Sequence, residues 1–76
     1  MFENKKILIL GFARSGYETA KILINRNNTV ILNDSKEEEK HDVSRVKELR
    51  DLGIEFVFGG HPDDLLDESF DYLIKN

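Results

Sequence analysis

An unbroken aliphatic run, Ile7–Leu10, leads directly into Gly11, and Gly16 follows five residues later. Such a run, set between lysines and a glycine, is typical of a strand that is buried on both faces of a sheet. After Gly16, apolar residues recur at spacings of three and four, which is the pattern of a helix with one apolar face. The start of the chain therefore predicts a strand over residues 5–10, a tight loop over 11–16 and a helix over 16–26.

The same alternation of strand and helix continues along the chain. The first helix is expected to end between Asn25 and Asn28, because Asn tolerates the left-handed backbone found just past helix ends. Gly53 supplies a similar stop for the second helix. The predicted elements are a strand over 29–33, a polar loop over 35–42, a helix over 43–52, a strand over 54–58, a short helix over 62–66 and a strand over 71–75.

Strands and helices that alternate in this way form a parallel sheet with right-handed crossovers. We expect an α/β fold: a Rossmann-like parallel sheet of about four strands in the order 3-2-1-4, with helices on both faces. Residues 1–76 make one small domain. No helix is predicted after the strand over 71–75, so the fold is expected to be truncated at its C-terminal end. That strand then lies at an open apolar edge, which predicts self-association.

Composition excludes several classes of function. The chain has no cysteine, which rules out disulfides, thiolate metal sites and cysteine nucleophiles. Residues 34–76 carry six basic and thirteen acidic side chains, a net charge of −7 that suits neither DNA nor RNA. Residues 1–33 carry five basic and two acidic side chains, a net charge of +3 that favours a small phosphorylated ligand. The aliphatic runs are too short for a membrane span or a signal peptide, so the cytoplasm is the expected compartment.

The loop from Gly11 to Gly16 is the first candidate binding site. A strand-to-helix turn gathers backbone N–H groups and a helix N-terminus, which together attract phosphate. Gly11 permits the sharp turn, and Gly16 permits close packing of the helix on the strand. Ala13 stands where the common dinucleotide fingerprint has a glycine, so the match to that fingerprint is degenerate. Arg14 could bind a phosphate through two parallel hydrogen bonds, or could simply be a solvated arginine.

Ser15 and Asp34 each have a structural and a ligand-binding interpretation. Ser15 could donate its hydroxyl to a ligand, and Ser15 with Glu18 also forms the sequence of a capping box. Asp34 lies 18 residues after Gly16 at the end of the second strand, where dinucleotide folds place an acid that binds ribose. An Asp-Ser pair also favours turns. Ser35 and Lys36 could line the same pocket.

Structural roles are predicted for the remaining polar residues. His61 is expected in a turn, and His41, in a charged stretch, is expected to be exposed. Residues 37–39 suit a solvated loop, and the acidic residues between 63 and 68 suit the wet face of the short helix. No catalytic triad, phosphate-binding Walker loop or metal-ligand spacing is present, so no catalytic residue and no metal ligand is predicted.

Four segments in a fixed order carry a family resemblance. They are Lys6–Gly16, Val30–Ser35, Leu52–Pro62 and Phe70–Asn76. Together they resemble the N-terminal domain of the Mur ligase family of peptidoglycan synthesis, over nearly the whole chain. The Gly-Gly-His-Pro loop at 59–62 and the closing Lys-Asn are the most telling, because family members usually continue with Pro-Gly.

The resemblance implies a fragment of a three-domain ligase that adds D-glutamate to UDP-N-acetylmuramoyl-L-alanine. The first domain would hold the uridine diphosphate end of this substrate, while the remaining ligase domains would bind ATP with Mg²⁺ and D-glutamate. These 76 residues alone are therefore expected to hold no cofactor and to be inactive. By position, Arg14 and Ser15 correspond to residues near the diphosphate, and Asp34, Ser35 and Lys36 to residues near the uracil and ribose. Gly11, Ala13, Gly16 and Asn76, which precedes the family's Pro-Gly turn, complete the implied site.

Two other functions stay open on the residues alone. Asp34 also suits an NAD(P)-binding or nucleotide-sensing regulatory domain, although Ala13 and the Gly-Gly-His-Pro loop count against it. The turns could also be purely structural, in an interaction domain that binds no nucleotide. UDP, NAD and ATP titrated separately would discriminate the three.

Overall fold

The computed structural model describes residues 3–12, 14–60 and 70–75. Its elements follow the predicted alternation, with bounds within one or two residues of those expected. None of the helices within these ranges is long and apolar enough to cross a membrane. The elements are β1 (Lys6–Leu10), α1 (Arg14–Ile24), β2 (Thr29–Asp34), the 3₁₀ helix η1 (Glu38–Lys40), α2 (Val43–Asp51), β3 (Glu55–Phe58) and β4 (Tyr72–Lys75).

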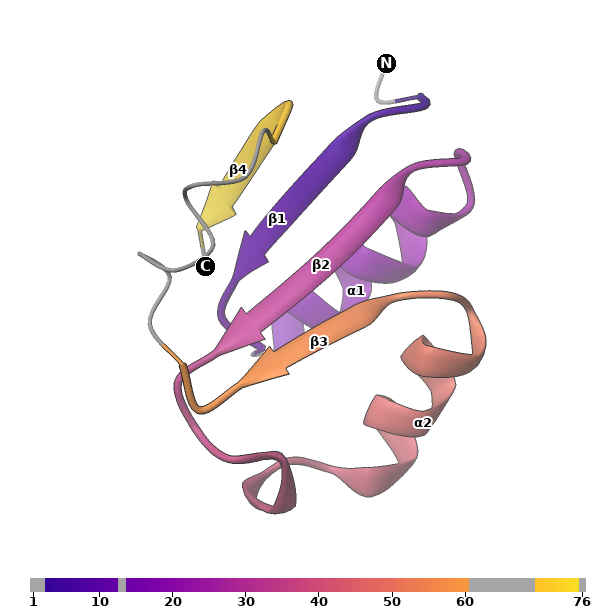
Figure 1. The fold of residues 1–76 in the computed structure, drawn as a ribbon. Helices are drawn as coiled ribbons and strands as arrows, with labels where there is room; N and C mark the ends of the chain where they lie inside the picture. Colours follow the sequence, from indigo (N-terminus) through magenta and orange to yellow (C-terminus); the bar gives the residue numbers. More distant parts are fainter. Residues whose placement is uncertain (1–2, 13, 61–69, 76) are drawn as a thin grey trace.

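The four strands form one parallel sheet in the order β3-β2-β1-β4, which confirms the predicted Rossmann-like α/β fold and strand order. Figure 1 shows the four arrows pointing the same way, with β3 and β4 at the two edges. β1 is paired on both sides. Its last residue, Leu10, lies level with Asn33 of β2 and Lys75 of β4. The sheet therefore brings the carboxyl ends of neighbouring strands together.

One face of the sheet carries the main core and receives both helices. Two successive right-handed crossovers in one direction along the sheet place α1 and α2 on the same side, and Figure 1 shows α1 behind β1 and β2. The core joins Ile7, Ile9, Val30 and Leu32 of the strands to Ala20, Leu23 and Leu49 of the helices, with Ile54.

The opposite face of the central strands is buried as well. Leu8 and Ile31 alternate with the core residues and are 0% and 5% exposed. This confirms that the aliphatic run belongs to a strand buried on both faces. The short helix expected over residues 62–66, which would supply the second helical face, lies outside the described residues.

Two asparagines end α1 and connect it to the start of β1. Asn27 adopts the left-handed backbone that the Asn-rich segment predicts, with φ 59°. Asn28 is 6% exposed, and its side chain bonds in two directions. Its Nδ2 donates to the Leu23 carbonyl at 2.8 Å, and its Oδ1 accepts from the Lys5 N–H at 2.8 Å. One buried amide therefore closes the helix and fixes where β1 begins.

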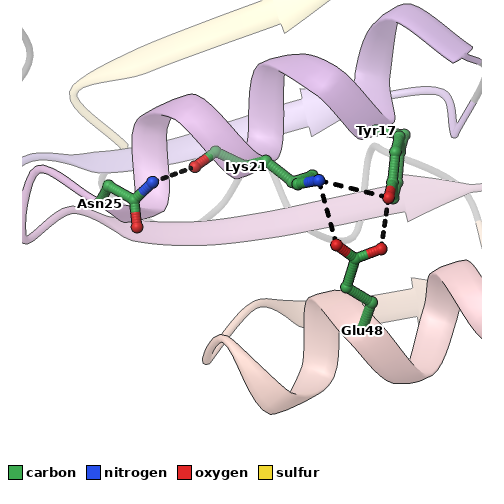
Figure 2. A network of polar contacts seen from close by, with 4 residues as sticks. All are labelled: Tyr17, Lys21, Asn25 and Glu48. Carbon is green, nitrogen blue, oxygen red and sulfur yellow. Dashed lines mark hydrogen bonds and ion pairs between the residues drawn. The ribbon is translucent and has the colours of Figure 1, made fainter.

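A polar network joins α1 to α2 across their exposed sides (Figure 2). The Tyr17 hydroxyl donates to a Glu48 carboxylate oxygen, and Lys21 Nζ lies 3.0 Å from the other. The bond to the Glu48 carboxylate raises the pKa of both Tyr17 and Lys21. The bond from Tyr17, followed by that from Lys21, lowers the pKa of Glu48. The network holds the two helices side by side on the same face of the sheet.

Replacing Asn28 by Ala tests the buried amide. Asn28→Ala leaves the Leu23 carbonyl and the Lys5 N–H without their side-chain partner, which is expected to lower the free energy of unfolding by roughly 1–3 kcal/mol. Urea unfolding followed by circular dichroism measures the change. The matched control is Asn25→Ala, whose exposed amide donates to the Lys21 carbonyl at 3.0 Å (Figure 2). If the two variants lose the same free energy of unfolding, the structural role of the buried Asn28 amide is contradicted.

Candidate functional site at the carboxyl ends of the strands

The carboxyl ends of β1, β2 and β3 are joined by backbone hydrogen bonds. The Gly11 N–H donates to the Asn33 carbonyl at 2.7 Å, and the Gly59 N–H donates to the Asp34 carbonyl at 3.0 Å. Open α/β sheets bind their ligands at this edge, outside the ends of the strands. The described residues that directly follow these strands, among them Gly11, Phe12, Ser35, Lys36, Gly59 and Gly60, therefore form the candidate site.

The carboxylate of Asp34 organises two of these loops. Its Oδ2 accepts the Phe12 N–H at 2.7 Å, and its Oδ1 accepts the Lys36 N–H at 2.9 Å. Partial burial opposes ionisation of this side chain, but the two N–H donors outweigh it. The net effect lowers the pKa of Asp34 below its ordinary value. The bond to Lys36 is the turn that an Asp-Ser pair favours, so the structural interpretation of Asp34 is confirmed; contact with a ligand stays a prediction.

The glycine loop has the predicted shape at its start, but the helix that follows it begins earlier than predicted. Gly11 has φ 103°, a conformation that residues with a side chain rarely adopt. Gly16 is buried within α1, as close packing on the strand requires. The helix begins at Arg14, so Ser15 lies in its first turn and not at the N-cap position. The predicted capping box is therefore wrong.

The other predicted site residues fall into three groups. Gly11 and Asp34 lie close together, because the Gly11 N–H donates to the Asn33 carbonyl and the next N–H, that of Phe12, donates to the Asp34 carboxylate. Arg14 and Ser15 are exposed at the start of α1, and Ser35 and Lys36 are exposed just after β2. Ala13 and Asn76 lie outside the described residues.

Four aromatic rings pack in a closed circuit beside Asp34. The Phe12 ring contacts Phe56 edge-on at 5.2 Å, and Phe56 stacks on Phe58 at 5.0 Å between centroids. His41 completes the circuit, with its ring 5.0 Å from Phe58 and 5.2 Å from Phe12. This aromatic cluster packs beside the described loop residues of the candidate site. Its members are spread over residues 12 to 58, so no local sequence pattern indicates it.

The His41 side chain is largely shielded from solvent, contrary to the expectation from its charged surroundings. Its side chain is 9% exposed, and its Nε2 lies 3.6 Å from Asp34 Oδ1. Its ring packs against Phe12 and Phe58, and close by Arg50 of α2 donates two hydrogen bonds of 2.8 Å to Glu38 of η1. The adjacent Lys40 and Asp42 do not indicate this shielding, because it depends on residues that are distant in sequence.

The Gly-Gly-His-Pro loop has a conformational reason for its first glycine. Gly59 has φ 74°, a backbone conformation that residues with a side chain rarely adopt, and it lies against the end of the Glu37 side chain. The loop after β3 thus packs closely against the segment after β2. Among the described residues, no group of three or more acidic or histidine side chains gathers that could hold a metal ion.

An anion bound at this edge would meet the first turn of α1. The Phe12 N–H already donates to Asp34, so it is engaged within the protein. The start of α1, the exposed Arg14 and the exposed Lys36 place positive charge at this edge, which attracts anions.

Comparison with known proteins connects this geometry to a biochemical class. No protein-family model matches the chain. Over 75 residues, or 99% of the chain, it is 45% identical to UDP-N-acetylmuramoylalanine–D-glutamate ligases of Streptococcus pyogenes serotype M5 (strain Manfredo), serotype M1 and serotype M49 (strain NZ131). The chain is similar to the N-terminal region of these Mur ligases. It spans 16% of the length of each relative. The resemblance that the four segments predicted is confirmed.

Replacing Asp34 by Asn tests how much the loops depend on its charge. Because the pKa of Asp34 is lowered on folding, its stabilisation is complete above the unfolded value of about 3.9 and is lost as the pH falls through the folded value. Asp34→Asn is expected to lower the free energy of unfolding by roughly 1–3 kcal/mol near neutral pH. Urea unfolding at several pH values should show this difference shrinking below about pH 3.9.

The matched control is Asp51→Asn, which breaks the exposed pair between Lys47 and Asp51 in α2. Exposed pairs of this kind contribute about 0.5 kcal/mol or less. An Asp34→Asn variant as stable as Asp51→Asn at every pH would contradict the organising role of Asp34.

Proposed function

We propose that this chain is the substrate-anchoring, N-terminal domain of an ATP-dependent ligase that joins D-glutamate to UDP-N-acetylmuramoyl-L-alanine in peptidoglycan synthesis. The observation that carries the proposal is the similarity to D-glutamate ligases along 99% of the chain. The parallel sheet with a glycine turn and an acid at the ends of β1 and β2 supports it, because uridine nucleotides suit such an edge.

The proposed role is to hold the uridine diphosphate end of the substrate. The loop residues Gly11, Ala13 and Gly16 would admit the diphosphate to the start of α1, where Arg14 and Ser15 would bind it. Asp34, Ser35 and Lys36 would surround the uracil and ribose, together with Asn76. Binding energy gained at this end would position the distant carboxylate for reaction elsewhere in the enzyme.

The reaction itself would take place on other domains. ATP would phosphorylate the substrate carboxylate, and the amine of D-glutamate would attack the acyl phosphate. Mg²⁺ and ATP would bind in those domains, since these 76 residues contain no phosphate-binding Walker loop. The enzyme would act in the cytoplasm, where nucleotide-linked precursors are made.

Removing the guanidinium of Arg14 tests the proposed diphosphate contact. In the complete ligase, Arg14→Ala is expected to weaken binding of UDP-N-acetylmuramoyl-L-alanine by about 1.5–3 kcal/mol, the range for a hydrogen bond to a charged group. Isothermal titration calorimetry measures the affinity, with NAD and ATP as comparison ligands. Arg26→Ala is the control, because Arg26 is exposed beyond the opposite end of α1. Tighter binding of NAD than of the uridine nucleotide would instead favour a dinucleotide-binding domain.

The open edge of the sheet leads to a second proposal, about the 76-residue chain on its own. β4 pairs only with β1 in the described sheet, and its Tyr72 and Leu73 are 42% and 47% exposed. An apolar edge strand offers its backbone N–H and C=O groups to another chain. We propose that isolated copies associate through β4.

A charge placed on that edge should prevent the association. The wild-type chain is expected to form dimers or larger species as its concentration rises, whereas Leu73→Lys should stay monomeric because a buried lysine opposes edge pairing. Sedimentation velocity over a hundredfold range of concentration measures this. Ile22→Lys, which replaces an exposed residue on α1, is the control and should associate like the wild type. A monomeric wild-type chain at all concentrations would contradict the proposal.

A further inference from the structure

The imidazole of His41 occupies a nearly closed position at the candidate site. Its side chain is 9% exposed and lies against the rings of Phe12 and Phe58. Its Nε2 is buried and makes no hydrogen bond to any residue in the described part of the chain. A buried polar atom without a partner is costly and rare in native proteins. The burial of this nitrogen therefore points to a role beyond packing.

The nearest charged atom to Nε2 is the Asp34 Oδ1 at 3.6 Å. This distance is too long for a hydrogen bond but short enough for strong attraction between opposite charges. Both side chains are shielded from water, with 9% and 16% exposed, so solvent screens the pair weakly. A protonated His41 would be attracted to the Asp34 carboxylate, whereas a neutral imidazole would not.

Asp34 connects the charge of His41 to both sides of the proposed nucleotide site. The same carboxylate holds the Phe12 N–H before α1 and the Lys36 N–H after β2. His41 also contacts the Phe12 ring directly. A charge at His41 therefore acts on the diphosphate side and the nucleoside side of the site through a single acid.

Several other charged side chains lie on the segments around His41, and each has an interaction of its own. Among the described residues, Asp34 is the acid within ion-pair distance of its ring. The neighbouring groups are Glu38, paired with Arg50; Asp42, which caps α2 by accepting from Ser44 and Arg45; Glu37, whose carboxylate lies against Gly59; and Lys36, whose charge acts on Asp34.

We propose that His41 is a positioning residue for the nucleotide-binding edge. In its protonated form it pairs with Asp34 and holds the loops at Phe12 and Lys36 in the arrangement that receives the ligand. The neutral imidazole lacks this attraction to Asp34, so the ligand binds more tightly when His41 carries the proton. This inference rests on the proposed function for the identity of the ligand, a uridine diphosphate sugar, but not for the link between His41 and Asp34.

The link is tested first without ligand. Nuclear magnetic resonance spectra of the wild-type chain, recorded from about pH 5 to about pH 8, follow the His41 ring, the Asp34 carboxyl carbon and the Phe12 amide. The Asp34 and Phe12 signals are expected to shift together with the titration of the His41 ring. They should lose this shift in His41→Phe, which keeps an aromatic ring in the cluster. If the chemical shifts of Asp34 and Phe12 do not change as the His41 ring gains its proton, the proposal is overturned.

Ligand affinity is then measured in the complete ligase by calorimetry with UDP-N-acetylmuramoyl-L-alanine, whose phosphodiesters do not titrate near neutral pH. The wild type should bind about 5-fold more tightly at about pH 6 than at about pH 8, the low end of typical coupling between two sites. His41→Phe should bind with the weaker affinity at both pH values. His41→Gln, which restores an uncharged N–H near the position of Nε2, should bind with intermediate affinity and no pH dependence. Thermal unfolding confirms that each variant is folded.

Lys47→Ala is the matched control, because it changes an exposed side chain of α2 outside the candidate site. It should keep the pH dependence of the wild type. Equal wild-type affinities at the two pH values, or a pH dependence that survives in His41→Phe, would overturn the proposal. If the wild type binds no uridine nucleotide at either pH, the proposed function fails, and the magnetic resonance titration alone decides whether His41 positions Asp34.

Discussion

The attachment of two loops to the Asp34 carboxylate is the interaction on which the candidate site depends. The parallel sheet delivers the ends of β1, β2 and β3 to one edge, but strand pairing alone does not shape the chain beyond them. Asp34 does so by accepting the N–H groups of Phe12 and Lys36. Because the acid is partly shielded and ionised, these bonds are charge-assisted and stronger than neutral ones. The loop conformation thus follows from where one charge is held.

Much of the fold was predictable because its signals are local. Each signal depends on residues that are close in sequence: an aliphatic run predicts a strand, apolar residues spaced three and four apart predict a helix, and a glycine or asparagine predicts where the helix ends. Strand order followed as well, since right-handed crossovers leave few ways to arrange alternating elements. Within the site, Gly11 and Asp34 were found for the same reason: each stands directly at the end of a predicted strand.

The parts that were missed depend on contacts between distant residues. No residue adjacent to His41 in the sequence indicates that its ring is shielded; the ring packs against Phe12, which follows β1, and Phe58 of β3. The capping box failed because α1 starts two residues before Gly16, the start that its apolar spacing had suggested. The buried amide of Asn28, which connects α1 to Lys5, could not be told from its neighbouring asparagines by composition.

The place of β1 in the middle of the sheet has a consequence for the order of folding. Its partner β2 is joined by a short crossover, with Lys5 and Asn28 only 23 residues apart. Its other partner β4 is anchored where Lys6 donates to Asp71, a separation of 65 residues. Closing the longer loop costs more chain entropy, and the contacts of β4 with β1 offset this cost only after the loop has closed. The sheet should therefore grow from β1 and β2 outward, with β4 docking last, so that during synthesis β1 waits with one side unpaired.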